Sequence, residues 1–291
     1  MDKNNNNEKL TKVGINWYPG HMAKTKREIK EKIDIVDVVV HVIDARIPKS
    51  SFIKDIDEFT KGKEKIILMS KYDLCDKDET NKWKNYYENL GYKVILKTEN
   101  VKKDLINTIN LLMKNINEKR KKNGLLPKKA KVMIVGVSNV GKSTLINKLV
   151  NKKATQVGNK PGITKNISMI KINNEIDLID TPGVLWPKFE DKDTALNLAS
   201  MTIIKEEVIP IDEVAIYILE TLNKYYPDKL KANFGIDNFN INDIEEYYLE
   251  ISKFKNISLL NGEVDFERIN YLVINLIKNE TIKGITFDRI K

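Results

Sequence analysis

The chain has 291 residues and a formal net charge of +9 at pH 7, from 50 Lys and Arg against 41 Asp and Glu. This length suits two domains with proper cores, and the single Cys75 excludes a disulfide-stapled fold. No apolar stretch reaches the roughly 18 residues of a membrane span. We therefore expect a soluble, cytoplasmic protein with a reduced thiol.

The chain opens with a polar, asparagine-rich stretch, and we expect residues 1–13 to be a disordered tail. From residue 14 to 190, short apolar runs alternate with helical patterns. That alternation is typical of an α/β domain with a parallel-rich sheet and helices on both faces. His41 lies inside the apolar run Val38–Ile43, where we expect a core histidine with its hydrogen bonds satisfied.

The strand-like run Lys65–Met69 leads into Ser70-Lys71-Tyr72-Asp73, which is close to the Asn-Lys-x-Asp element that reads guanine. Asp73 can accept hydrogen bonds from the guanine N1–H and the exocyclic amine, a pair that adenine lacks. Lys71 would lie along the purine face. Ser70 replaces the usual asparagine and shortens the reach to the base. A plain surface turn is the alternative.

A second base-contacting loop usually follows the next strand, which we expect at Lys93–Leu96. That places it at Lys97-Thr98-Glu99, with Thr98 as the candidate contact. The position fits this role, whereas the residues differ from the usual Ser-Ala-Lys pattern.

Residues Gly136–Ser143 fit the phosphate-loop pattern G-x-x-x-x-G-K-S, between a strand-like run, Val132–Val135, and a helical one, Thr144–Val150. Two glycines let the loop turn tightly so that its N–H groups point at the phosphates. Lys142 would bridge the β- and γ-phosphates, and Ser143 would hold Mg²⁺. The predicted nucleotide contacts of the loop are Asn139, Val140, Gly141, Lys142, Ser143 and Thr144.

Asp180-Thr-Pro-Gly183 follows the strand-like Ile176–Ile179 and completes the phosphate site. The Asp180 carboxylate would sit near the metal, through a water molecule, and the Gly183 N–H would meet the γ-phosphate. Thr164 is either a further Mg²⁺ ligand or an ordinary loop threonine. Asn139 is either a turn former or, through its amide oxygen, a ligand for a monovalent cation such as K⁺.

The order of these motifs is unusual, because the base-reading element precedes the phosphate loop. A conventional GTPase runs the other way round, so the order indicates a circularly permuted P-loop GTPase domain over residues 14–190. Residues 100–131 would join the ancestral ends. This connection begins with the helical run Lys103–Met113 and ends in the basic stretch Lys119–Lys131.

After residue 190 the strand signals stop, and we expect a small all-helical domain over residues 191–291. Helical spacing recurs in Ile211–Tyr226, Ile241–Phe254 and Asp265–Glu280, with Asp265 as the predicted N-cap of the last. Charge divides at the same point: residues 191–291 have a net charge of −6 and residues 1–190 one of +15. The basic part favours a polyphosphate partner such as rRNA, although an AT-rich genome also yields many lysines.

With these motifs in this order, the chain resembles the bacterial ribosome biogenesis GTPase A family (RbgA/YlqF). Three further strings support the resemblance: Asn16-Trp-Tyr-Pro-Gly-His-Met22, Asp44-Ala-Arg-Ile-Pro48 and Asp180-Thr-Pro-Gly-Val-Leu-Trp-Pro-Lys-Phe-Glu190. The resemblance implies GTP hydrolysis stimulated by the large ribosomal subunit, potassium-aided chemistry with Mg²⁺, and a role late in large-subunit assembly. We expect a monomer with no membrane partner.

Val184 and Leu185 stand where Ras-type enzymes have a water-orienting glutamine. The resemblance points to His21 as the residue that positions the water; the alternative is a structural loop histidine. Since Asp180-Thr-Pro-Gly183 runs into the helical part, nucleotide state could also reorient those helices. Two other functions compete: a metabolic P-loop kinase, which leaves the guanine element unexplained, and an RNA-binding scaffold that holds nucleotide without hydrolysing it.

Overall fold

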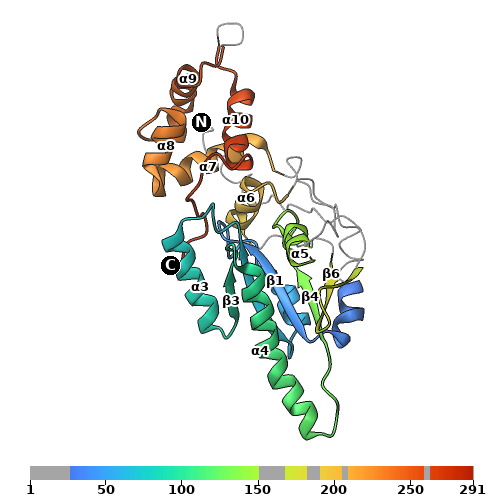
Figure 1. Cartoon of the computed structure of the whole chain (residues 1–291). Coiled ribbons are helices and arrows are strands. Elements are labelled where there is room, and N and C mark those ends of the chain that lie inside the picture. The colour runs from blue at the N-terminus through green and yellow to red at the C-terminus, as the bar shows by residue number, and fades with distance from the viewer. Residues whose placement is uncertain (1–26, 151–167, 182–190, 205–208, 259–262, 291) are drawn as a thin grey trace, which may run out of the picture.

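The computed structural model describes residues 27–150, 168–181, 191–204, 209–258 and 263–290 (Figure 1). The tail predicted over residues 1–13 lies outside these ranges. At the centre of the first part is a six-stranded sheet of order β3-β2-β1-β4-β6-β5. Its strands are β1 (Val38–Asp44), β2 (Glu64–Ser70), β3 (Lys93–Leu96), β4 (Ala130–Val135), β5 (Ser168–Lys171) and β6 (Ile176–Asp180).

Neighbouring strands in this sheet are parallel except β5 and β6, which are antiparallel. The central strand β4 lies between β1 and β6. Starting from β4, the chain passes to the β6 side of the sheet, and the strands on the other side, β1 to β3, come earlier in the sequence. The topology is therefore a cyclic rotation of the usual order, as the motif order predicts.

The described helices of the first part include α2 (Lys54–Phe59), α3 (Lys77–Asn89), α4 (Val101–Lys122) and α5 (Lys142–Val150). Figure 1 shows α4 and α5 in front of the sheet. Helix α4 extends past the predicted end at Met113 to Lys122, because the lysine-rich stretch is made of good helix formers and the first breaker is Gly124, with φ 71°.

The second part is helical in every element that the structure describes beyond residue 190: α6 (Lys192–Ser200), α7 (Ile211–Tyr225), α8 (Pro227–Phe234), α9 (Ile244–Phe254) and α10 (Phe266–Lys278). The predicted cap is confirmed, since the Asp265 side chain accepts from the Arg268 N–H. Helices α6 and α8 are short and were not predicted. None of the described helices is both long enough and apolar enough to cross a membrane.

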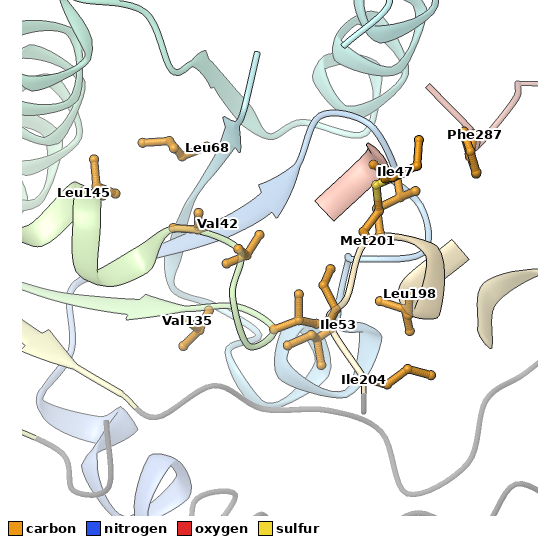
Figure 2. Packing of buried hydrophobic residues seen from close by; sticks show 14 of the residues in the cluster. Val42, Ile47, Ile53, Leu68, Val135, Leu145, Leu198, Met201, Ile204 and Phe287 are labelled. Carbon is orange, nitrogen blue, oxygen red and sulfur yellow. The ribbon is translucent and has the colours of Figure 1, made fainter. Parts of the chain in front are cut away.

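One hydrophobic core extends from the sheet into the helical part. Figure 2 shows Leu198 of α6 and the following Met201 near Ile47 and Ile53, which come after β1. All four side chains are buried. Packing of this kind fixes the position of α6 against the edge of the sheet where the parallel strands end.

The last residues of the chain return to the α/β part instead of continuing the helical one. Residues 282–290, which we call the C-terminal clasp, place the Gly284 N–H on Leu74 O at 2.8 Å and the Phe287 N–H on Arg46 O at 2.7 Å. Trp83 Nε1 donates to Asp288 O at 3.1 Å. The clasp therefore joins the end of the chain to the loops that follow β1 and β2.

Candidate nucleotide-binding site

The base-reading element begins where β2 ends. Ser70 is fully buried, and its hydroxyl donates to Ile43 O of β1 at 2.9 Å. Lys71 adopts a left-handed backbone with φ 52°, and the Leu74 N–H closes the turn on Lys71 O at 3.0 Å. Asp73 is exposed at the tip of this turn. The turn thus presents the Asp73 carboxylate to solvent, where a guanine could meet it.

A buried ion pair lies at the end of the neighbouring strand β1. Arg46 Nη2 lies 2.8 Å from Asp44 Oδ2, and both side chains are almost fully buried. The Arg46 N–H and Nε also donate to Asp44 Oδ1, at 2.9 and 3.1 Å. Burial lowers the pKa of the nearby Lys71, an effect that Asp44 opposes. The string Asp44-Ala-Arg46 contributes to the family resemblance, whereas the pairing of its two charged side chains is visible only in the fold.

The phosphate loop follows β4 with the conformation that its pattern predicts. Gly136 has φ 154°, and a Cβ there would lie 2.3 Å from Val42 O, so only glycine fits. Gly141 has φ 95° and Asn139 φ 56°. Val140 is buried, whereas Ser143 and Thr144 are accessible in the first turn of α5. The N-terminus of this helix favours an anion such as phosphate.

Lys142 is enclosed by its own loop. Its Nζ donates to Gly136 O at 2.9 Å and to Val137 O at 2.7 Å. Burial lowers the pKa of Lys142 to about 8, while the carboxylate of Asp180 works in the opposite direction. A phosphate in the loop would strengthen the charged form by direct attraction.

The base-reading and phosphate elements meet at Gly141. A Cβ built on Gly141 would lie 3.9 Å from Lys97 Nζ and 3.9 Å from Ser70 Cβ. Thr98 follows directly, with its hydroxyl accepting from the Asn100 N–H at 3.3 Å and its carbonyl from Lys148 Nζ at 3.4 Å. The predicted second loop is therefore close to the phosphate loop, and its Thr98 hydroxyl already has a partner.

Asp180 ends β6 beside Lys142. It is buried, and neither carboxylate oxygen has a hydrogen-bond partner among the described residues. Burial raises the pKa of Asp180 to about 6, and Lys142 opposes that shift. An orphaned buried carboxylate next to a phosphate loop suits a hard cation with oxygen ligands, so the residues present fit Mg²⁺. Thr181 fixes the strand end by donating its hydroxyl to Ile134 O at 2.8 Å.

Asn139 links the phosphate loop to the helical part. Its Nδ2 donates to Thr202 O, in the turn after α6, at 3.1 Å. The left-handed backbone of Asn139 supports the turn-former interpretation, because asparagine tolerates positive φ. The contact with Thr202 was not predicted, since nothing in the sequence pairs these positions.

Three predicted site residues, His21, Thr164 and Gly183, lie outside the described residues.

His41 is described, and its contacts confirm the prediction of a core histidine. Its Nε2 accepts from the Ile53 N–H at 3.2 Å, its ring stacks on Phe52, and burial lowers its pKa to about 3. Cys75 is buried and free, as expected. Burial raises the pKa of its thiol.

The fold and site together define the class: a P-loop GTPase domain whose strands and motifs are circularly permuted. Comparison with known proteins agrees. Residues 23–190 match the family described as RsgA GTPase, and residues 131–251 match the one described as 50S ribosome-binding GTPase. The particular family follows from full-length relatives.

The ribosome biogenesis GTPase A of Priestia megaterium is 37% identical over 278 residues, which cover 94% of this chain and 96% of the relative. The protein of that name from Thermotoga maritima is 33% identical, with 87% and 94% covered. A crystal structure of GNP-bound YlqF from T. maritima superimposes with a TM-score of 0.61 at 27% identity, covering 91% of this chain and 98% of that one. This chain belongs to the ribosome biogenesis GTPase A family.

Proposed function

We propose that this protein hydrolyses GTP late in assembly of the large ribosomal subunit, as a nucleotide-controlled factor whose slow intrinsic turnover the subunit stimulates. The observation that supports the nucleotide chemistry best is the meeting of the guanine-reading turn and the phosphate loop at Gly141. Support for the partner comes from the match to 50S ribosome-binding GTPases. Such a partner also implies a cytoplasmic site of action, and we expect the isolated protein to be a monomer.

In this proposal Lys142 and the backbone N–H groups of the phosphate loop bind the β- and γ-phosphates. Ser143, Thr164 and Asp180 would hold Mg²⁺, with Asp180 acting through water. Mg²⁺ would neutralise charge on the transferred phosphoryl group. Asp73 and Lys71 select guanine, with Thr98 beside the base.

Because Val184 and Leu185 stand where other GTPases have a catalytic glutamine, two other residues would supply the catalytic roles. His21 would orient the attacking water when the protein is on the subunit. The Asn139 amide oxygen would bind K⁺ beside the phosphates and so add positive charge in the transition state. The G domain that does this would span residues 14–190, followed by the helical domain of residues 191–291.

The test is phosphate release from GTP and from ATP, measured in potassium and in sodium buffer, with and without large ribosomal subunits. We expect slow GTP turnover that rises strongly when subunits and potassium are both present, and little turnover of ATP. GTP turnover that subunits leave unchanged would contradict the assembly function. Binding of GTP without any hydrolysis would favour the RNA-binding scaffold instead.

His21→Ala is a second arm of the same assay. We expect it to bind GTP normally and to lose the subunit-stimulated turnover. Full stimulated turnover in this variant would remove His21 from the mechanism, while the GTPase assignment would remain.

A further inference from the structure

A basic projection leaves the α/β part at the edge opposite the nucleotide site. The fully buried side chains of α4 end at Met113, and Ile116 is half-buried against the core. The rest of the helix continues to Lys122 with mostly exposed side chains. Residues 123–129 are exposed and return to the start of β4. Figure 1 shows this hairpin-like excursion projecting past the sheet. We call residues 114–131 the basic finger.

The finger is held in shape by specific hydrogen bonds. Asn117 clamps the backbone of Lys128, donating from Nδ2 to Lys128 O at 3.3 Å and accepting the Lys128 N–H on Oδ1 at 3.0 Å. Arg120 fastens the tip, since its Nε donates to Leu126 O at 2.9 Å and its carbonyl accepts the Leu125 N–H at 2.9 Å. The returning residues therefore lie along the helix as an ordered arm.

Charge in the finger is almost entirely positive. Residues 114–131 contain eight Lys and Arg and one acid, Glu118. The described structure pairs one of these cations, Lys128, with Asp37 at the base of the finger. Elsewhere in the finger, no ion pair to a described carboxylate involves the exposed lysines Lys119, Lys121, Lys122 and Lys129.

Clustered lysines at the end of α4 repel one another, and nothing in the described fold requires them there. One or two cations in the last turn of a helix interact favourably with its dipole, but consecutive lysines also repel one another. The tip is also unusual, because Leu126 is 83% exposed. Beside the base of the finger lies a cavity of about 460 Å³. Its polar lining comprises amides such as Asn110, the lysines Lys114, Lys128 and Lys129, and one acid, Glu175. Clustered cations beside amides suit a polyanion.

We propose that the basic finger is a docking surface for RNA, with Lys119, Lys121, Lys122 and Lys129 on the phosphate backbone and the exposed leucines of the tip on a base or sugar. The proposal rests on the proposed function, because a ribosomal subunit presents a dense array of RNA phosphates. It adds the location of the contact. The finger lies where the permuted chain joins the old ends of the domain, away from the phosphate loop.

The test compares two triple variants that have the same net charge. In the finger variant Lys119, Lys121 and Lys122 become glutamine, and in the control the exposed Lys61, Lys93 and Lys103 become glutamine. Binding is measured to a labelled RNA hairpin, to large ribosomal subunits, and to vesicles of phosphatidylglycerol and phosphatidylcholine, over a range of salt concentrations. GDP binding and intrinsic GTP hydrolysis are measured in parallel.

We expect the finger variant to bind RNA and subunits on the order of tenfold or more weakly, with the log–log salt slope reduced by about 2 to 3. The control should bind like the unmodified protein, and GDP binding should be unchanged in both. Equal losses in the two variants, or none in either, would overturn the proposal, as would a finger variant that loses binding to vesicles alone. If unmodified protein binds RNA through the finger but gains no turnover from subunits, the proposed function fails and the RNA surface stands.

Discussion

At the residue scale, the Ser70 side chain holds the end of the strand and leaves recognition of the base to another residue. The Ser70 side chain points into the sheet, where its hydroxyl holds Ile43 O, and it lies beside Gly141 of the phosphate loop. The carboxylate that would read guanine belongs to the exposed Asp73. Holding the strand end and reading the base are therefore assigned to different side chains, which can be altered one at a time.

We predict opposite outcomes for Ser70→Ala and Asp73→Ala. Ser70→Ala should lower the free energy of unfolding by about 1 kcal/mol, from the lost hydrogen bond, and leave the preference for GTP over ATP intact. Asp73→Ala should keep its stability and lose about 1–3 kcal/mol of that preference, roughly fivefold to 150-fold. Urea unfolding and competition of GTP or ATP against a fluorescent GDP measure both. A Ser70→Ala protein that no longer prefers GTP would contradict the division.

Sequence spacing predicted the residues whose role is local. Gly136, Gly141 and Lys142 sit at fixed offsets within one loop, so the pattern determines their geometry. The partners of Ser70 and Arg46 were not predictable in this way. The Ser70 hydroxyl donates to Ile43 O of the neighbouring strand, and the Arg46 carbonyl accepts the Phe287 N–H of the C-terminal clasp. Such contacts depend on which strands pair and on where a distant segment returns.

At the element scale, the C-terminal clasp is the feature that sequence reading missed. It has no helical or alternating pattern, yet most of its side chains are buried. Asp288 lies at its centre: its carboxylate accepts from the Ser50 N–H at 2.7 Å, from Ser50 Oγ at 2.8 Å and from Asn197 Nδ2 at 2.8 Å. One side chain thus joins the clasp, the loop after β1 and helix α6.

Asp288→Ala should destabilise the protein by roughly 3 kcal/mol, because three buried donors lose their acceptor. The matched control is Lys283→Ala, which alters an exposed side chain of the same segment and should change stability by less than about 0.5 kcal/mol. Urea unfolding followed by tryptophan fluorescence measures the stability, and one of the three tryptophans, Trp83, contacts the clasp through its bond to Asp288 O. Equal stability of the two variants would show that the clasp is held mainly by its apolar side chains.

The clasp also makes stability depend on pH in a defined direction. Burial raises the pKa of Asp288 to about 6, although the Ser50 donors oppose the shift. The folded state therefore binds this proton more tightly than the unfolded state, whose carboxyl has a pKa near 3.9. Between about pH 4 and pH 6, this group makes the free energy of unfolding fall as pH rises. The Asp288→Ala protein should lose this contribution and keep that of Asp180, whose pKa burial also raises to about 6. The difference in slope between the unmodified protein and the variant is a second readout of the same substitution.

At the scale of the whole molecule, permutation places the helical part directly after the Asp180-Thr-Pro-Gly183 segment, which we expect to contact the γ-phosphate. The order of the motifs was enough to predict this arrangement, because that order does not depend on where each helix or strand is predicted to end. The sequence did not predict a second connection, from Asn139 of the phosphate loop to Thr202 after α6. The helical part is therefore tied to the nucleotide site both by chain continuity and by a side chain of the phosphate loop.

We predict that nucleotide state changes hydrogen exchange in the helical part, both on and off the ribosome. Amides of α6 and α7 should exchange more slowly with a non-hydrolysable GTP analogue than with GDP, because an ordered phosphate loop holds Thr202 in place. Asn139→Ala should shrink that difference at saturating nucleotide, measured in sodium buffer so that any potassium role of Asn139 does not enter. Identical exchange in the two nucleotide states of the unmodified protein would rule out the coupling. A difference that survives Asn139→Ala would instead assign it to the chain connection through residues 182–190.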